Sequence, residues 1–169
     1  MSHIVIDGYN LVPKIPRLAN LSLEEARSFL TTQLAQYKKL KPNKMSLVFD
    51  GRSHLSEFAT SYQEKGIHVI FSAHPQTADD VIIDLIRKEK NRLIVVSSDQ
   101  AILKQAQKHG SAFLSSQEFY QRMQNAALAN EDVHEDPQRP HKRWTTKKKG
   151  PRRKLPKKQR RQRQRLEKL

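Results

Sequence analysis

Short runs of apolar, mostly β-branched residues recur through the first two thirds of the chain. Most of them are continuously apolar rather than alternating, which is typical of strands that are covered on both faces. Such strands need other elements packed above and below their sheet. The five runs are HIVID at 3–7, MSLVFD at 45–50, HVIF at 68–71, RLIVVSSD at 92–99 and SAFLS at 111–115.

Segments of helical character lie between these runs. The first begins with Ser22 and Glu25 in capping-box spacing, and the third ends at Gly110, which suits a helix C-cap. Alternating strands and helices predict a mainly parallel sheet in a three-layer α/β sandwich. The stretch 52–66 is expected to be a loop followed by a short helix. The predicted helices cover residues 22–40, 79–90, 99–110 and 116–129.

Charge divides the chain of 169 residues into two parts. Residues 1–137 carry 16 Lys and Arg against 16 Asp and Glu, whereas residues 138–169 carry 16 Lys and Arg against one acid. The whole formal charge of +15 therefore comes from the last 32 residues. We predict a folded domain over 1–129, a polar linker containing proline over 130–141, and a basic tail over 142–169.

The basic tail has few apolar residues to bury, so it is expected to be disordered when free, although KKQRRQRQRLEKL can become helical on a partner. Its charge suits nucleic-acid phosphates, because each phosphate neutralised releases counterions. RNA, and the ribosome as an abundant structured RNA, is the expected partner. A purely solubilising tail is the alternative. The expected substrate contacts in the tail are Lys147, Lys148, Arg152 and Arg153.

Several classes of protein are excluded or disfavoured. The chain has no Cys, which excludes disulfides, Cys-ligated zinc and thiol catalysis. It has neither a GxxxxGK[ST] phosphate-binding loop nor a GxGxxG dinucleotide fingerprint. No apolar run reaches the ~18 residues of a membrane span, and the start MSHIVIDGYN lacks the features of a signal peptide. We expect a cytoplasmic protein that does not bind membranes.

Aspartates follow three of the five predicted strands, at Asp7, Asp50 and Asp99. In an open α/β sheet, ligands bind in the crevice beyond the carboxyl ends of the strands. Parallel strands would bring these three carboxylates to one edge, and the TADD segment would add Asp79 and Asp80 from the same side. Four loops then deliver acidic side chains to one place.

Each aspartate also has an ordinary structural explanation. Thr77 and Asp80 are close to capping-box spacing, and Asp99 can cap the helix that follows it. Asp7 and Gly8 can form a tight turn. Capping alone explains four acidic positions at one edge less easily than it explains any one of them.

Carboxylates that lie close together repel and raise each other's pKa unless a positive charge lies among them. Apart from Arg52, which follows Asp50, no Lys or Arg lies within three residues of these acids. Mg²⁺ takes oxygen ligands and commonly combines one or two carboxylates with waters and substrate phosphate. The pattern therefore indicates metal-assisted hydrolysis of a phosphate ester. Arg52 is a candidate phosphate clamp, and Ser97 and Ser98 are candidate hydrogen-bond donors to phosphate.

Four motifs of the chain follow one another along the predicted domain: VIDGYN (5–10), LVFDG (47–51), TADD (77–80) and SSD (97–99). On these motifs the chain resembles the YacP-like NYN domains of the PIN-like nuclease superfamily. The resemblance spans roughly residues 3–125 and leaves the basic tail outside the family pattern. It implies a PIN-like α/β sandwich and a metal-dependent endoribonuclease.

The resemblance also implies roles for individual residues. Asp7, Asp79 and Asp99 would bind Mg²⁺ or Mn²⁺ and act in catalysis. Asp80 would assist them, although relatives often carry Glu at this position. Asn10 would orient Asp7 or a substrate phosphate. The remaining member of the implied site, which would line it or hold a metal-bound water, is Asp50.

Three functions remain open at this point. The first is a divalent-metal endoribonuclease tethered to RNA or the ribosome by the basic tail. The second is a non-catalytic RNA-binding or ribosome-binding factor on the same fold, and the third is a structure-specific DNA nuclease. Clustered acids favour the enzyme, because a pure binder of phosphates gains little from them. The sequence does not determine the oligomeric state.

Overall fold

The sheet of this computed structural model has six strands and is mainly parallel. The structure describes residues 2–51, 60–131 and 157–167. The strand order is β3-β4-β2-β1-β5-β6, and every neighbouring pair is parallel except β3 with β4. The strands are β1 (His3–Asp7), β2 (Lys44–Phe49), β3 (Thr60–Glu64), β4 (Ile67–Phe71), β5 (Leu93–Val96) and β6 (Ala112–Leu114).

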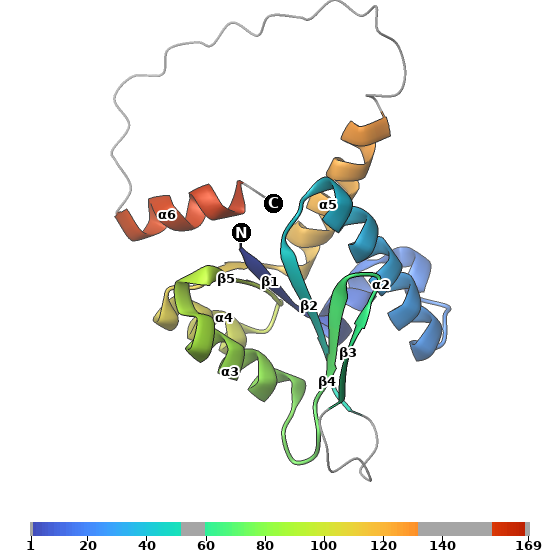
Figure 1. Cartoon of the computed structure of the whole chain (residues 1–169), viewed down its shortest axis with the longest axis horizontal. Coiled ribbons are helices and arrows are strands. Elements are labelled where there is room, and N and C mark those ends of the chain that lie inside the picture. The colour runs from blue at the N-terminus through green and yellow to red at the C-terminus, as the bar shows by residue number, and fades with distance from the viewer. Residues whose placement is uncertain (1, 52–59, 132–156, 168–169) are drawn as a thin grey trace, which may run out of the picture.

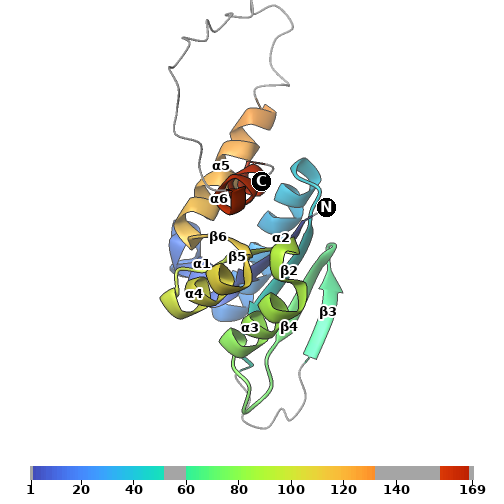
Figure 2. The ribbon, with the colours of Figure 1, turned by 90° about the vertical axis from the view of Figure 1, so that its left-hand side faces the viewer.

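Helices cover both faces of the sheet, which confirms the predicted three-layer sandwich (Figures 1 and 2). One core includes Leu30 of α2 and Phe119 of α5, and the other includes Ile82 of α3 and Ile102 of α4. The helices are α1 (Gly8–Leu11), α2 (Leu23–Leu40), α3 (Ala78–Glu89), α4 (Gln100–His109), α5 (Ser116–Glu131) and α6 (Lys157–Leu166), with 3-10 turns at η1 (Val12–Lys14), η2 (Pro16–Leu18) and η3 (Lys90–Arg92).

The helix ends follow the signals in the sequence. The Ser22 hydroxyl accepts a hydrogen bond from the backbone of Glu25, and the Glu25 carboxylate accepts one from the backbone of Ser22. Gly110 ends α4 with a φ of 78°, a left-handed conformation that glycine adopts without strain. Helix α5 continues to Glu131, two residues past the predicted end of the domain. Among the described residues, no helix is both long and apolar enough to cross a membrane.

Strand β3 corrects the expectation of a short helix within 52–66. Its residues pair antiparallel with β4 through a two-residue turn at Lys65 and Gly66. Both turn residues have positive φ, 50° and 79°, which is the geometry of a type I′ hairpin. The strand is almost wholly exposed, so its sequence TSYQE lacks the apolar run that marks a buried strand. Residues 52–59 lie outside the described part of the chain.

Helix α6 corrects the expectation that the whole basic tail is disordered. Its Lys, Arg and Gln residues are strong helix formers. The side chain of Gln162 donates to the backbone carbonyl of Ser111 at 3.0 Å, and Arg122 of α5 donates to the carbonyl of Leu166. Leu166 also packs against the core that α2 and α5 share. These contacts hold the helix on the domain.

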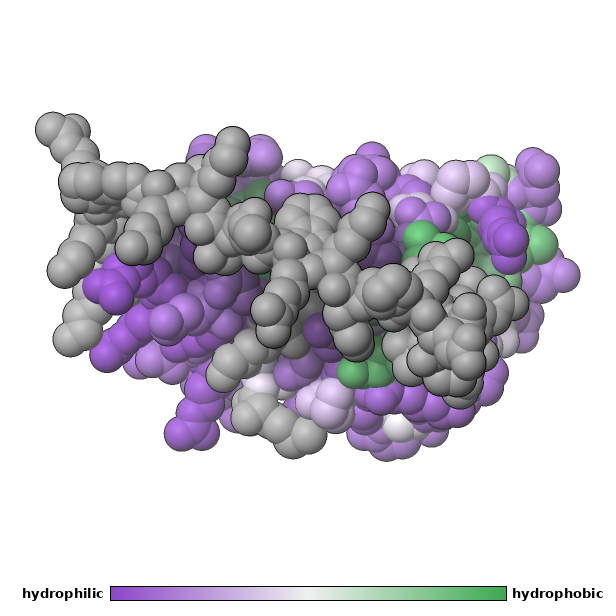
Figure 3. Space-filling view, turned by 90° about the horizontal axis from the view of Figure 1, so that it is seen from above, coloured by the Kyte–Doolittle hydropathy of each residue, from purple (hydrophilic) through white to green (hydrophobic). Residues whose placement is uncertain are grey.

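Helix α6 lies at the amino end of the sheet. It contacts strand β6, and its Gln162 donates to Ser111, the residue directly before that strand begins. Both ribbon views place the helix at the end of the sheet where β1 begins. Figure 3 views the molecule from this end and shows a largely hydrophilic described surface with isolated apolar patches. The carboxyl ends of the parallel strands therefore point away from α6.

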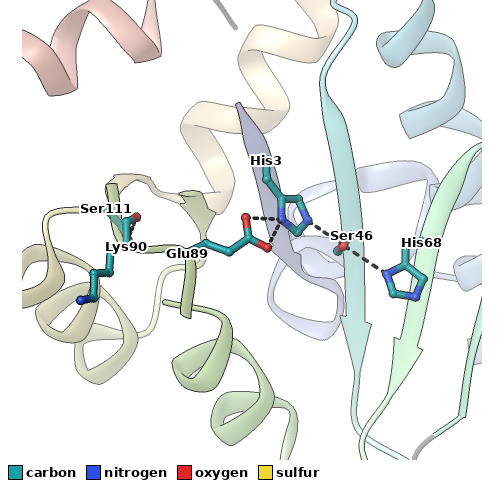
Figure 4. A network of polar contacts seen from close by, with 6 residues as sticks. All are labelled: His3, Ser46, His68, Glu89, Lys90 and Ser111. Atoms are coloured by element: carbon teal, nitrogen blue, oxygen red, sulfur yellow. Dashed lines mark hydrogen bonds and ion pairs between the residues drawn. The ribbon is translucent and has the colours of Figure 1, made fainter. Parts of the chain in front are cut away.

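A polar network is buried between the sheet and the end of α3 (Figure 4). The Nδ1 of His3 contacts the two carboxylate oxygens of Glu89 at 2.8 and 2.9 Å, and its Nε2 contacts the Ser46 hydroxyl at 2.8 Å. The same hydroxyl lies 3.5 Å from Nδ1 of His68. These contacts join β1, β2, β4 and α3, and they satisfy polar groups that would otherwise be costly to bury.

Burial is the largest influence on His3 and lowers its pKa, and the neighbouring Lys44 and His68 act in the same direction. The hydrogen bond and negative charge of Glu89 oppose this effect. A histidine whose pKa is lower in the folded state binds a proton more readily after unfolding. Its contribution to stability is therefore present above the unfolded pKa near 6.5 and is lost as the pH falls.

We expect the pH dependence of the free energy of unfolding between about 7 and 5 to differ between the natural protein and a His3→Gln variant. On lowering the pH, the natural protein should lose stability relative to the variant, because only the natural protein loses the contribution of His3. One proton accounts for at most about 1.4 kcal/mol per pH unit of this difference in slope. Urea denaturation at several pH values measures both slopes. Identical slopes in the two proteins would show that His3 does not titrate on unfolding.

Candidate active site

Four aspartates come out at one edge of the sheet, which is where the sequence analysis expected them. Asp7 ends β1, Asp50 directly follows β2, and Asp99 caps α4 after β5. Because these strands are parallel, their carboxyl ends share this edge. Asp79 is the second residue of α3, which follows β4. We call the surface formed by these four aspartates the acid rim.

Asp7 is the buried member of the acid rim, with 8% of its surface exposed. Its Oδ1 accepts a hydrogen bond from the backbone N–H of Asn10 at 3.1 Å, and its Oδ2 accepts one from the Ser97 hydroxyl at 3.1 Å. Burial raises the pKa of Asp7 to about 6, and the negative charges of Asp79 and Asp50 add to the rise. The two hydrogen bonds partly offset it.

Asp79 is an exposed member of the acid rim. Burial is the largest cause that raises its pKa, followed by the negative charges of Asp99, Asp50 and Asp80. Within the described ranges, no N–H or O–H group donates to this carboxylate. Its oxygens are therefore available to a ligand that carries positive charge.

Ser97 connects two members of the acid rim. It is completely buried, donates its hydroxyl to Asp7, and accepts the backbone N–H of Asp99 at 3.0 Å. Its hydroxyl is buried and not open to a phosphate, so of the two uses that the sequence leaves open for Ser97 the structure shows the structural one. Asp99 caps α4 through its Oδ1, which accepts the N–H groups of Ala101 and Ile102 at 2.7 and 3.1 Å. Its Oδ2 accepts nothing from the described part of the chain.

Asn10 holds three segments together. Its side-chain oxygen accepts hydrogen bonds from the backbone of Ser98 at 3.1 Å and from the hydroxyl of Ser116 at 3.0 Å. The Ser98 hydroxyl in turn accepts the backbone N–H of Ser116 at 3.3 Å. Through its own backbone N–H, Asn10 also orients Asp7. Ser116 was not predicted as a site residue, and its position at the start of a helix gives no distinctive sequence signal.

Asp50 ties the end of β2 to the start of α3. Its Oδ1 accepts the backbone N–H of Ala78 at 2.6 Å and the hydroxyl of Ser72 at 3.3 Å. Ser72 is buried and also accepts the backbone N–H of Gly51 at 3.1 Å. The sequence analysis did not include Ser72. The only available signal is a polar residue directly after the strand HVIF.

Asp80 has the capping role that the sequence analysis considered as an alternative. Its Oδ2 accepts the backbone N–H and the hydroxyl of Thr77 at 3.0 and 2.9 Å, and Thr77 caps α3 in return. These hydrogen bonds lower the pKa of Asp80. The contact keeps the first turn of α3 in place and thereby positions the neighbouring Asp79.

Gly8 allows α1 to begin directly after β1. A Cβ atom at this position would lie 2.2 Å from the ring of Phe49, so any side chain would force the ring or the helix to move. The close approach keeps the backbone of Asn10 within hydrogen-bond distance of Asp7. The glycine of the DGYN motif is therefore explained by packing at the acid rim.

Five of the predicted substrate contacts lie outside the described part of the chain. One follows Asp50 in sequence, and the other four belong to the basic tail. Nothing in the structure tests their predicted roles. They are Arg52, Lys147, Lys148, Arg152 and Arg153.

The acid rim suits a hard divalent cation in its chemistry. The described residues contain no group of three His, Asp or Glu side chains that is already arranged to hold a metal ion. Mg²⁺ needs only one or two carboxylates together with waters, so it does not require such a group. Neighbouring aspartates raise the pKa of Asp7 and of Asp79, and a cation bound among these carboxylates would relieve that repulsion. The residues present therefore fit Mg²⁺ or Mn²⁺.

The fold and the acid rim define the class of PIN-like α/β proteins, whose domains are generally nucleases and typically use divalent metals. A family model described as YacP-like NYN domain matches residues 4–168, so the chain belongs to this family. The match reaches through the basic tail, which corrects the expectation that the tail lies outside the family pattern.

Similar proteins come from Bacillus subtilis. The protein YacP of strain 168 is 33% identical over an alignment of 106 residues. The alignment covers 59% of this chain and 61% of YacP, so the chain matches less than two thirds of the length of YacP. Two crystal structures of Rae1 (YacP) are also similar, one of them of a point variant. They have TM-scores of 0.65 and 0.62 at 26% and 25% identity, and the matches cover 78% and 79% of this chain and 80% and 79% of theirs.

Replacing the charge of Asp7 is expected to stabilise the metal-free protein. A carboxyl whose pKa is raised by folding costs stability above pH 6, and this cost disappears as the pH falls toward 4. In EDTA at pH 7.5, Asp7→Asn should raise the free energy of unfolding by roughly 1–3 kcal/mol, as urea denaturation would measure.

The matched control is Asp84→Asn, which removes an aspartate that is 60% exposed on α3. Its stability should stay within about 0.5 kcal/mol of the natural protein. Near pH 4 the advantage of Asp7→Asn should vanish. If Asp7→Asn had the same free energy of unfolding as the natural protein at pH 7.5, the negative charge of Asp7 would not destabilise the folded state.

Proposed function

We propose that this protein is a divalent-metal-dependent endoribonuclease that hydrolyses RNA phosphodiester bonds. The observation that carries the proposal is the acid rim itself. Asp7 and Asp79 lie at the carboxyl edge of a PIN-like sheet. Burial and the negative charges of neighbouring aspartates raise the pKa of each, Asp79 and Asp50 acting on Asp7, and Asp99, Asp50 and Asp80 acting on Asp79. Evolutionary kinship with the YacP-like NYN family, whose superfamily is that of PIN-like nucleases, supports the same chemistry.

Asp7, Asp79 and Asp99 are the residues that would hold Mg²⁺ or Mn²⁺. The ion, when bound, supplies stabilisation of the charge that develops on the phosphodiester and lowers the pKa of a nearby water. Each of these carboxylates can contribute an oxygen in a different way. Asp7 is fixed by two hydrogen bonds, Asp99 has one oxygen outside its helix cap, and Asp79 is open.

The hydrogen bonds around the acids prepare the site before any ligand binds. Ser97 fixes Asp7 relative to Asp99, and Asn10 fixes the loop that follows β5 relative to α1. Asp50 fixes the start of α3, which carries Asp79. A site whose carboxylates are held in this way loses little freedom on binding, which favours catalysis through positioning.

The basic tail is proposed to hold RNA, with the ribosome as the favoured large partner in the cytoplasm. Its predicted contacts are Lys147, Lys148, Arg152 and Arg153, and α6 adds further Lys and Arg residues on the folded domain. Affinity of this kind depends on phosphate charge rather than on base sequence. The tail would thus concentrate the enzyme on RNA, and the acid rim would perform the reaction.

Cleavage of end-labelled RNA tests the enzyme. We expect cutting in Mg²⁺ or Mn²⁺ but not in EDTA, and a loss of about 100-fold or more in Asp7→Asn and Asp79→Asn. Asp80→Asn is the matched control, because it changes the same charge in the next residue. Since Asp80 caps α3, this variant should lose less than about 10-fold.

Other outcomes would point to the other functions. RNA binding without cleavage, on free RNA and on ribosomes alike, would support a non-catalytic binding factor. Preferential cutting of structured DNA would support the DNA nuclease. Equal losses in Asp79→Asn and Asp80→Asn would show that the assignment of roles within TADD is wrong.

Removing tail charge should weaken RNA binding without changing the chemistry. We expect a variant with Gln at the four predicted tail contacts to bind single-stranded RNA less tightly and to lower the slope of log K against log salt by about 3. Cleavage of a saturating short RNA should be unaffected. A control with Gln at four exposed domain lysines should leave the slope nearly unchanged; these are Lys14, Lys39, Lys88 and Lys104.

A further inference from the structure

A row of aromatic rings crosses one edge of the sheet. Phe49 of β2 and Phe71 of β4 are paired residues, and their rings stack with centroids 5.6 Å apart at an interplanar angle of 25°. Tyr62 of β3 continues the row, with its centroid 6.3 Å from that of Phe71 at 21°. At the other end, the ring of Tyr9 lies 5.0 Å from that of Phe49.

The strand register places this row beside the acid rim. Asp7 pairs with Val48, so Phe49 and Phe71 lie one residue further toward the carboxyl edge. Tyr9 follows Asp7 by two residues. Neighbouring strands lie about 4.8 Å apart, so β3 is only about 14 Å from β1. The row therefore runs from the outer edge of the sheet to the carboxyl edge that bears the acid rim. It lies on the face covered by α2 and α5, whereas Asp7 pairs with Val48 of the opposite face.

Exposure increases along the row toward the outer edge. Phe49 is fully buried, Phe71 is half-buried, and Tyr62 is 45% exposed. Strand β3 is the outermost strand among the described residues, and none of their other strands lies beside it on that side. A lone exposed aromatic residue is ordinary on a protein surface. Here the exposed ring ends a stack of parallel rings, and its orientation is fixed by the stack.

A cationic side chain accompanies the row. The guanidinium carbon of Arg27 lies 5.3 Å from the ring centroid of Phe71, and no carboxylate of the described residues forms an ion pair with it. Glu64, the acidic residue of β3, lies at the end of the strand away from the acid rim. Lys65 in the β3–β4 turn and Lys38 of α2, which donates to Gly66, lie at that far end too and are not part of the row.

We propose that Tyr62, Phe71 and Arg27 form a platform on which an unpaired base of the RNA substrate stacks before the strand reaches the acid rim. This proposal rests on RNA being the substrate. Aromatic faces accept any base, and an Arg plane both stacks on bases and attracts phosphates. A base inside a duplex has no free face, so the platform selects single-stranded RNA.

The exposed edge of β3 offers one other type of contact. An unpaired strand edge can pair with a second copy of the chain or with an extended peptide. Backbone pairing explains neither the stacked rings nor the guanidinium of Arg27 beside them. Nucleic acid explains both, so we assign the edge to RNA and treat self-association as an outcome of the test.

A fluorescent base provides a direct measure of stacking. Full-length Asp7→Asn protein, which should bind without cutting, is titrated into short single-stranded RNAs that carry 2-aminopurine at successive positions. Salt is raised to weaken the contribution of the tail. We expect the protein to quench the fluorescence of 2-aminopurine at one position of the RNA. The double variant Asp7→Asn with Tyr62→Phe should quench it at the same position, because a phenylalanine ring can still stack. Tyr62→Leu should abolish it and weaken binding by about 10-fold.

Control variants separate stacking from folding. Tyr120→Leu removes a half-buried tyrosine on α5, away from the row, and should leave both signals unchanged. Thermal unfolding checks that each variant is folded. Quenching that persists in Tyr62→Leu, or the absence of quenching at every position, would overturn the platform. A change in oligomeric state without a change in quenching would also overturn it and identify a protein interface.

The outcome is independent of the proposed enzymatic activity. Metal-dependent cleavage by the natural protein, without any effect of Tyr62→Leu on stacking or affinity, would remove the platform alone. Tyr62-dependent stacking without cleavage would remove the enzyme alone and leave an RNA-binding protein. Arg27→Gln adds a third measure, since loss of one phosphate contact should lower the salt slope by about 0.7 for single-stranded RNA.

Discussion

The arrangement of the molecule depends on the parallel pairing of its central strand. β1 is buried at every position and pairs with β2 on one side and β5 on the other. Because all three strands run in the same direction, the residue that ends each of them arrives at one edge. Reversing either neighbour would move Asp50 or Asp99 to the far end of the sheet. The acid rim is thus a consequence of strand direction, and the loops only complete it.

The apolar runs and helix caps were sufficient to predict five strands, the helices between them and the sandwich. The sequence indicated that residues 157–169 can form a helix, but it was not sufficient to predict β3 or the docking of α6 on the domain, for related reasons. β3 is an exposed edge strand, so its residues carry no burial pattern and its pairing depends on a turn at Lys65 and Gly66. α6 is held by Leu166 and a few hydrogen bonds to distant residues, and a count of apolar residues does not reveal such an anchor.

The acids of the site were visible in the sequence, but the hydroxyls that position them were not. Ser97 and Ser72 are common residue types after strands, and their roles depend on partners as far as 90 positions away. The capping explanation and the functional explanation also proved compatible. Asp99 caps α4 with one oxygen and has another outside the cap, so the helix that it starts also fixes its direction.

The position of α6 gives the molecule a charge gradient along its strands. Six Lys and Arg residues of this helix lie at the amino end of the sheet, and four aspartates lie at the carboxyl end. A polyanion at a distance exerts a torque on such a dipole and turns the cationic end toward itself. If RNA is the substrate, as proposed, its first encounter with the protein would favour the end remote from the acids, and a strand would have to pass along the flank of the sheet to reach them.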